Sequence, residues 1–187
     1  MERQSTNDGA GTPLSATGRA ILGLLGSAPR TGYDIKSAVD GSIRFFWAAS
    51  YGQIYPELKR LESAGLVRVA SAEKGGRRRS VYEITAAGRD ALQAWLASDA
   101  ELTTEMRDEG LLRFFFSDLV DREEALANVR AMRAHHEAMV RRLREIEPKS
   151  IQARDAGRRF PYLTLMGGIE LHEQRAAWCA RMEKELS

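Results

Sequence analysis

The sequence predicts a mainly α-helical protein, with a small N-terminal domain that carries one β-hairpin and a C-terminal domain of long helices. Three observations predict this fold class. Apolar residues recur at helical spacing through most of the 187 residues. Two β-rich segments flank a loop of glycines and arginines between residues 67 and 84. In the C-terminal half, apolar residues alternate at spacings of three and four over two long stretches, as in coiled coils.

The N-terminal domain, placed at residues 14–98, is expected to begin with two helices that start at capping side chains. Ser15 is suited to cap a helix that ends near Gly26, because a hydroxyl oxygen accepts a hydrogen bond from the backbone of the first turn. Thr31 is suited to cap a second helix that ends near Val39 in the same way.

A third helix is expected from about Ser50 to Ala64, and its two faces differ. Its apolar face has the spacing of a buried stripe and consists of Ile54, Leu58 and Leu61. Its opposite face is small or polar and consists of Gly52, Gln53, Pro56, Lys59 and Arg60. Ser50 and Gln53 are expected to form a capping box at its start. Pro56 is tolerated only near the first turn, and Gly65 is suited to end the helix.

A hairpin with a basic tip is expected to follow this helix. Residues 66–69 and 81–84 are suited to two paired strands. Between them, two glycines stand among four cations: Lys74, Arg77, Arg78 and Arg79. Such a tip suits a phosphate backbone or a minor groove. A helix, a hairpin and a basic tip in this order are typical of a winged helix-turn-helix, a fold that binds DNA.

The third helix and the hairpin are therefore predicted to bind double-stranded DNA, at a palindromic operator if the protein is a dimer. The side chains expected at base edges are Ser50, Tyr51 and Gln53. The side chains expected at phosphates are Tyr55, Lys59, Arg60, Lys74, Arg77, Arg78 and Arg79. An alternative from a different class is a protein–protein interaction module, in which the basic wing binds an acidic partner and reads no DNA.

The C-terminal domain is predicted at residues 99–187, beyond a helix that Thr85 caps and that ends near Ala97. A short helix is expected at about 105–116. Its last residues, 111–116, are too apolar to face water, so we expect them in a core or a subunit interface. An apolar effector pocket near the dimer interface is a further hypothesis, with plain core packing as the alternative, for Trp95, Phe114, Phe115, Met139 and Trp178.

Two long helices are expected to complete this domain. One runs from Asp121 to Glu147, where Pro148 is expected to stop it. The other starts near Pro161, after a polar connector at 154–159. Their alternating apolar residues indicate an antiparallel coiled-coil-like pair whose exposed edge docks on a second subunit. The residues predicted at that dimer interface are Val129, Met132, His136, Leu143, Ile169 and His172.

Four stretches of the N-terminal half are distinctive. They are I-L-G-L-L at 21–25, T-G-Y-D-I at 31–35, F-W-A-A-S-Y-G-Q-I-Y-P-E-L-K-R-L-E-S-A-G-L-V at 46–67, and V-Y-E-I-T-A-A-G at 81–88. Together they resemble the PadR family of bacterial transcription regulators and cover about half of the chain. The resemblance implies a homodimeric repressor that dimerises through C-terminal helices and, in some members, answers to a small molecule or a stress signal. By position, it places DNA contacts on the Ser50–Arg60 helix and the Lys74–Arg79 wing.

Composition and charge fit a cytoplasmic protein that binds nucleic acid. The net charge is +2, but residues 1–98 hold 13 Lys and Arg against 9 Asp and Glu, whereas residues 99–187 hold 15 against 17. A single cysteine, Cys179, excludes an internal disulfide and suits a reducing cytosol. We find no apolar leader and no run of membrane-spanning length. The polar residues 1–13 predict a disordered N-terminus.

No motif for catalysis or cofactor binding is found, so we expect neither an enzyme nor a cofactor. The sequence lacks a phosphate-binding glycine loop and a C-x-x-C pair, and no second histidine follows His172-Glu173 at metalloprotease spacing. Two hypotheses compete with plain packing in the long helices. One is a metal site formed by His136 and His172. The other is a redox sensor at Cys179, which an apolar position disfavours because burial raises a thiol pKa.

Overall fold

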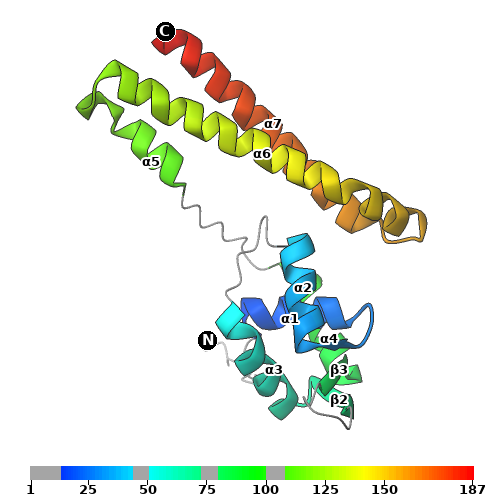
Figure 1. The fold of residues 1–187 in the computed structure, drawn as a ribbon. Helices are drawn as coiled ribbons and strands as arrows, with labels where there is room; N and C mark the ends of the chain where they lie inside the picture. Colours follow the sequence, from blue (N-terminus) through cyan, green and yellow to red (C-terminus); the bar gives the residue numbers. More distant parts are fainter. Residues whose placement is uncertain (1–13, 44–50, 73–79, 100–107) are drawn as a thin grey trace, which may run out of the picture. The chain divides into compact units, whose positions relative to one another are not determined.

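The computed structural model describes residues 14–43, 51–72, 80–99 and 108–187, and the chain divides into two compact units (Figure 1). The N-terminal unit spans Met1–Glu101 and the C-terminal unit spans Leu102–Ser187. The predicted disordered N-terminus lies outside the described residues. Within the ranges given above, no helix has both the length and the apolar character that a membrane span requires.

The described helices of the N-terminal unit are α1 (Ala16–Leu25), α2 (Gly32–Ala38), α3 (Ile54–Ser63) and α4 (Ala86–Leu96). Three of them, α1, α2 and α4, begin at the predicted caps. The Ser15 hydroxyl accepts a hydrogen bond from the backbone of Gly18, and the Thr85 hydroxyl accepts one from Gly88. Thr31 forms a reciprocal capping box with Asp34. All three predicted caps are confirmed.

The start of α3 differs from the prediction. A 3₁₀ turn at Tyr51–Gln53 (η2) precedes it, and Gln53 is the N-cap residue without a side-chain hydrogen bond to the helix. The capping box expected from Ser50 and Gln53 involves Ser50, which lies outside the described residues. With Ile54 as the first helical residue, Pro56 falls in the first turn, where the missing N–H costs no helix bond.

The wing belongs to a sheet of three strands, not two. The strands are β1 (Arg30–Thr31), β2 (Val67–Ala72) and β3 (Ser80–Ile84), in the order β1-β3-β2 with antiparallel neighbours. Arg30 pairs with Tyr82, so the turn before α2 supplies the third strand. A strand of two residues shows no alternation in the sequence, and only pairing with β3 identifies it. A short π-helical turn, η1 (Val39–Ile43), follows α2.

The apolar stripe of α3 lies in the core of this unit, as predicted. Ile54, Leu58 and Leu61 are at most 2% exposed. They share a cluster with residues from α1, α2 and the sheet: Ile21, Leu22, Leu25, Ile35, Val67 and Ile84. Gly65 has φ 71°, and the backbone N–H of Leu66 donates to the carbonyl of Leu61 at 2.9 Å. This Schellman motif ends α3 and starts β2 directly after it.

The C-terminal unit consists of two long helices with a short one packed beside them. Its elements are α5 (Glu109–Phe115), η3 (Ser117–Leu119), α6 (Arg122–Asp155) and α7 (Arg159–Leu186). α6 and α7 lie side by side as an antiparallel pair, joined by a short connection (Figure 1). Asp121 caps α6 by accepting from the backbone of Glu124 at 2.8 Å, as predicted.

Pro148 does not end α6, which corrects the predicted boundary. The helix continues to Asp155 and ends where Gly157 adopts φ 88°, with the N–H of Arg158 donating to the carbonyl of Ala153 at 2.8 Å. A proline inside a helix costs about 3 kcal/mol. A contact beyond the proline contributes about 0.5–1 kcal/mol in the opposite direction: the guanidinium of Arg154 lies over the Tyr162 ring of α7, 4.8 Å from its centroid. The polar connector predicted at 154–159 is therefore reduced to residues 156–158, because α7 begins at Arg159.

The apolar end of α5 divides between core and surface. Leu111 and Phe114 pack on a cluster of Val129, Met132 and Cys179 between the long helices. Phe115 and Phe116 are 77% and 53% exposed in the single chain. Core packing therefore accounts for only part of this segment.

Candidate nucleic-acid interface and ligand pocket

The face of α3 opposite the core is exposed. Gln53, Tyr55 and Lys59 all lie on the surface, and Tyr55 is 56% exposed. These are the predicted α3 contacts whose side chains the structure describes as exposed. Six predicted contacts cannot be placed: Ser50, Lys74, Arg77, Arg78 and Arg79 lie outside the described residues, as does the side chain of Tyr51.

A close approach between α2 and α3 positions Tyr55. A Cβ atom at Gly32, the first residue of α2, would lie 2.6 Å from Cε1 of the Tyr55 ring. Only glycine leaves room for this ring at that point. One side of the Tyr55 ring therefore packs against Gly32 of the T-G-Y-D-I stretch, and the rest of the side chain is exposed to solvent.

Arg60 has a partner within the fold. Its Nε and Nη2 donate to the two carboxylate oxygens of Glu57 at 3.0 and 2.7 Å. The Ser15 hydroxyl donates to the same carboxylate at 2.6 Å. The hydrogen bond from Arg60 is the main cause of the lowered pKa of Glu57, and it prevails over the opposing effect of burial. This network joins α3 to the capped start of α1.

The strands place the ends of the wing segment. Ala72 and Ser80 form the last pair of the β2–β3 ladder, so residues 73–79 connect two paired strands. At the other end of the ladder, Val67 pairs with Ile84, and both are buried in the core. The wing segment thus extends from a hairpin that is anchored beside the end of α3.

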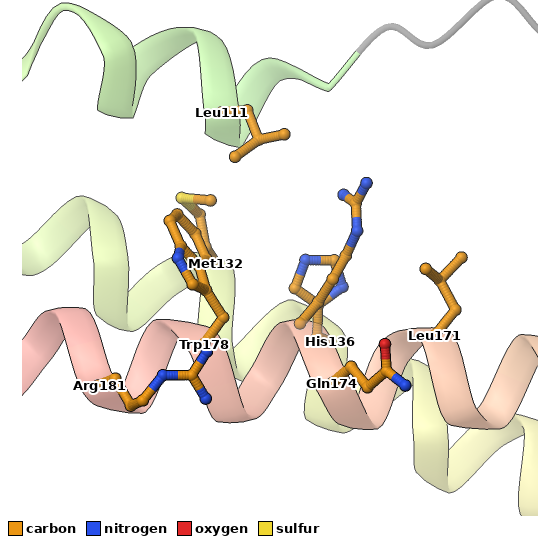
Figure 2. A pocket seen from close by; sticks show the side chains of 8 residues that line it. Leu111, Met132, His136, Leu171, Gln174, Trp178 and Arg181 are labelled. Carbon is orange, nitrogen blue, oxygen red and sulfur yellow. The ribbon is translucent and has the colours of Figure 1, made fainter.

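A pocket of about 350 Å³ lies in the C-terminal unit, between α5, α6 and α7 (Figure 2). Its lining residues are Leu111 from α5, Met132 and His136 from α6, and Leu171, Gln174, Arg175, Trp178 and Arg181 from α7. Four of these are apolar or aromatic and four are polar or cationic. The volume lies within the usual range of small-molecule sites.

This pocket overlaps little with the predicted one. Trp178 lines it, and the Phe114 ring packs edge-on against Trp178 with centroids 5.4 Å apart. Phe115 is exposed and Met139 is half-buried on α6. Trp95 belongs to the N-terminal unit, where the guanidinium of Arg19 lies 5.2 Å from its ring centroid.

Sequence reasoning missed seven lining residues: Leu111, Met132, His136, Leu171, Gln174, Arg175 and Arg181. The spacing of Leu171, Arg175 and Trp178 by four and three residues was a usable signal for one face of α7. The sequence could not predict that Leu111 lines the pocket, because its position depends on where α5 packs on the long helices. Gly110 permits that packing, since a Cβ there would lie 2.7 Å from Cγ of Met132.

An ion pair closes the polar end of the pocket region. Nη1 of Arg175 donates to Oδ2 of Asp108 at 2.5 Å. The other oxygen, Oδ1, accepts from the backbone of Leu111 at 3.1 Å and caps α5. Burial raises the pKa of Asp108, but the hydrogen bonds from Leu111 and Arg175 outweigh it, so the pKa lies below the usual value.

Two histidines pair across the long helices. The Nδ1 atoms of His136 and His172 lie 2.9 Å apart, so one ring donates a proton and the other accepts it. Burial is the main cause that lowers the pKa of both rings, and neighbouring cations add to it. Among the residues that the structure describes, no group of three metal-binding side chains occurs, so the pair finds no third ligand.

The six residues predicted at a dimer interface lie on the faces of α6 and α7 that pack within one chain. Val129, Leu143 and Ile169 are at most 2% exposed there. A second subunit reaches these side chains only if the helix pair opens. Cys179 is also buried between these helices, and burial raises its thiol pKa, which opposes a redox role.

Two family profiles match the chain, one for each unit. The transcriptional regulator PadR-like family matches residues 21–94, and the virulence activator alpha C-terminal family matches residues 106–187. The negative transcriptional regulator PadR of Bacillus subtilis is 29% identical over 168 residues, which cover 85% of this chain and 91% of that protein.

Solved structures show the same similarity. Bacillus subtilis PadR in complex with operator DNA is 28% identical with a TM-score of 0.79, covering 90% of this chain and 98% of that one. The same protein in complex with p-coumaric acid has a TM-score of 0.73, with 28% identity and coverage of 90% and 96%. The virulence activator AphA of Vibrio cholerae is 27% identical with a TM-score of 0.70, covering 91% and 98%.

Proposed function

The chain belongs to the PadR-like family of transcriptional regulators, and on this premise we propose that it is a homodimeric repressor that binds operator DNA. α3 enters the major groove, and the wing, residues 73–79 between β2 and β3, contacts the adjacent backbone. The observation that carries the proposal is the exposed face of α3, with Gln53, Tyr55 and Lys59, opposite a stripe that is at most 2% exposed. The relative crystallised with operator DNA supports it.

The roles of the individual side chains follow from their surroundings. Gln53, with Ser50 and Tyr51, reads base edges, since an amide pairs with adenine through two hydrogen bonds. Lys59 and Tyr55 hold phosphates, as do the wing cations Lys74, Arg77, Arg78 and Arg79. Arg60 also holds a phosphate in this proposal. In the single chain it is paired with Glu57 of the same helix, and Ser15 at the start of α1 donates to the same carboxylate.

A second copy of the chain supplies the second DNA-binding helix. Four apolar side chains around α5 are more than half exposed in the single chain: Leu112, Phe115, Phe116 and Leu119. Apolar surface of this extent is characteristic of an interface. Two-fold symmetry then presents two copies of α3 to a palindromic operator, about one helical turn of DNA apart.

A small aromatic effector releases this repressor from its operator. The complex of the Bacillus subtilis relative with p-coumaric acid supports an effector of that size. Ligand binding relieves repression when the ligand prefers the conformation that does not fit DNA. Repression takes place in the cytoplasm, where the DNA is.

Binding to a fluorescently labelled fragment of the chain's own promoter tests the proposal by anisotropy. Lys59→Ala is expected to weaken binding by roughly tenfold, with Lys149→Ala on α6 as the matched control. Gln53→Ala is expected to cost about 1–3 kcal/mol of preference for the promoter over unrelated DNA. Replacing Arg77, Arg78 and Arg79 by Ala is expected to weaken binding to all DNA and to flatten the salt dependence by roughly 0.9 per lost phosphate contact.

The rival function is a protein-interaction module whose basic wing binds an acidic partner. The same titration separates the two, because a module of that kind gives no anisotropy change with any fragment at low salt. Equal affinity of wild-type and Lys59→Ala protein for the promoter would contradict the role of α3.

A further inference from the structure

A largely buried carboxylate lies on the flank of α3, the helix that the proposed function places in the major groove. Nε and Nη2 of Arg60 donate to the two oxygens of Glu57 at 3.0 and 2.7 Å, as a bidentate pair. The Ser15 hydroxyl at the start of α1 donates to Oε1 of the same carboxylate at 2.6 Å. The Glu57 side chain is only 12% exposed, and these donors compensate its charge. The carboxylate is therefore directed toward α1 and away from the exposed face of α3.

The guanidinium of Arg60 is more open to solvent than its partner, because its side chain is 33% exposed. A guanidinium has five N–H donors, of which Glu57 accepts one from Nε and one from Nη2. Within the part of the chain that the structure describes, Nη1 donates no hydrogen bond, so its two N–H groups are available to a phosphate. An arginine that is already held at one edge loses less rotamer entropy when it binds than one that moves freely.

The position of the carboxylate depends on a glycine of α1. A Cβ atom at Gly18 would lie 2.4 Å from Oε1 of Glu57 and 3.4 Å from Nη2 of Arg60. Gly18 is buried inside α1, where alanine would otherwise be the better helix former. Gly23 of the same helix differs, because a Cβ atom there would meet nothing within 4 Å. The helix thus leaves space for the Glu57–Arg60 pair at one of these two glycines.

We propose that Glu57 is a positioning residue for DNA binding, which holds the guanidinium of Arg60 so that its Nη1 donates to a phosphate of the operator. Ser15 and the space at Gly18 fix the carboxylate in this position. The inference rests on the proposed function, because it explains how one of its phosphate contacts is built. It makes an acidic side chain of the DNA-binding helix favourable to binding. Coulomb's law alone predicts the opposite sign, since a carboxylate near the duplex repels phosphates.

The experiment measures binding of the full-length protein to the labelled promoter fragment by anisotropy at several salt concentrations. Arg60→Ala is expected to weaken binding about tenfold and to lower the salt dependence by roughly 0.9, as one phosphate contact is lost. Glu57→Gln is expected to weaken binding about three- to fivefold in the wild-type chain, because a neutral amide no longer holds the guanidinium through two charge-assisted bonds. In the Arg60→Ala background, the same change is expected to strengthen binding about twofold, because it then removes only a repulsion.

Two alanine substitutions in α1 test the same mechanism without a change in α3 or in net charge. Gly18→Ala places a Cβ atom against the Glu57 carboxylate and is expected to weaken promoter binding about threefold. Gly23→Ala is the matched control and is expected to leave the affinity unchanged. Both substitutions raise the helix propensity of α1, so a general effect on that helix would change both variants alike. Thermal denaturation followed by circular dichroism verifies that each variant is folded.

Three results would overturn the proposal. They are unchanged or tighter promoter binding by Glu57→Gln in the wild-type chain, a loss of the same size in the Arg60→Ala background, and equal affinities of the Gly18→Ala and Gly23→Ala variants. If the wild-type protein binds its promoter and Lys59→Ala weakens that binding, such results remove only the role of Glu57. A wild-type protein that binds no promoter at low salt overturns the proposed repressor function and this inference together.

Discussion

The described core of the N-terminal unit is entirely apolar, whereas the C-terminal unit buries His136 and Cys179 between its long helices. The first core draws on helices and a sheet, so each side chain is held from several directions. The second is a seam between two helices, with a pocket where α5 meets it. The difference indicates a rigid frame around α3 and a more adjustable C-terminal unit. An apolar core tolerates little movement, while a polar seam responds to charge.

The largest expected effect is loss of a core side chain in the rigid unit. Leu58→Ala removes a fully buried side chain from the stripe of α3 and is expected to lower the free energy of unfolding by about 2–5 kcal/mol. Urea denaturation followed by circular dichroism measures it. Leu143→Ala on α6, at 2% exposure, is the matched change in the other unit. Loss of DNA binding with Leu143→Ala but not with Leu58→Ala would contradict the assignment of the two units.

A smaller effect is expected at the left-handed glycines that end α3 and α6. Gly65→Ala and Gly157→Ala each place a side chain at positive φ, 71° and 88°, at an expected cost of about 1–2 kcal/mol. Gly65 leads directly into β2, so its replacement should also reduce DNA affinity, which anisotropy measures. Gly157 lies between the long helices, and its replacement should leave DNA affinity unchanged. An equal loss of DNA affinity in both variants would contradict the inference that the end of α3, and not the end of α6, matters for DNA binding.

The histidine pair makes the stability of the C-terminal unit depend on pH. The pKa values of His136 and His172 are lowered in the folded chain, whereas an unfolded histidine has a pKa of about 6.5. At a pH between the folded and the unfolded pKa, the unfolded chain therefore binds more protons than the folded chain. Stability is therefore complete above about pH 6.5 and falls as the pH drops below it. The titratable or charged groups that act on the pair are His135, Arg175 and Asp108.

Thermal denaturation between pH 8 and 5 measures this dependence. Replacing both His136 and His172 by Leu should flatten it, whereas His135→Gln, at an exposed position, should largely retain it. A double variant with the wild-type pH profile would exclude the pair as its cause.

The smallest expected effect is a chemical one at Cys179. Burial and a raised pKa should keep the native thiol almost unreactive towards a thiol reagent at pH 7.5 until the helix pair opens. The rate of reaction, compared with that of the denatured chain, measures this opening. Rapid labelling of the native protein would show that the seam opens far more readily than its packing indicates.

The family assignment agrees with most of what the motifs predicted. The resemblance to PadR regulators is confirmed, and membership in a family of transcriptional regulators confirms the expectation of a protein that is not an enzyme. The predicted DNA contacts and the dimer interface stay predictions. Among them, Arg60 and the seam residues have structural partners of their own in the single chain.

Local sequence determined the features that need only neighbouring residues. Ser15, Thr31 and Thr85 cap their helices with hydrogen bonds to residues three positions on, and the stripe of α3 follows from its period. The apolar seam on each long helix follows from its alternating spacing in the same way. These features depend on hydrogen bonds and periodicity within a few turns of chain, so they are readable without a structure.

Tertiary structure decided the features that join distant residues. β1 exists because Arg30 and Thr31 meet β3, and Ser15 at the start of α1 donates to the carboxylate of Glu57 on α3. α6 passes through Pro148 and remains in contact with α7 beyond it, where Arg154 meets Tyr162. The pocket depends on where α5 rests on the long pair. No local pattern encodes these contacts, because their energies come from partners that only the folded chain brings together.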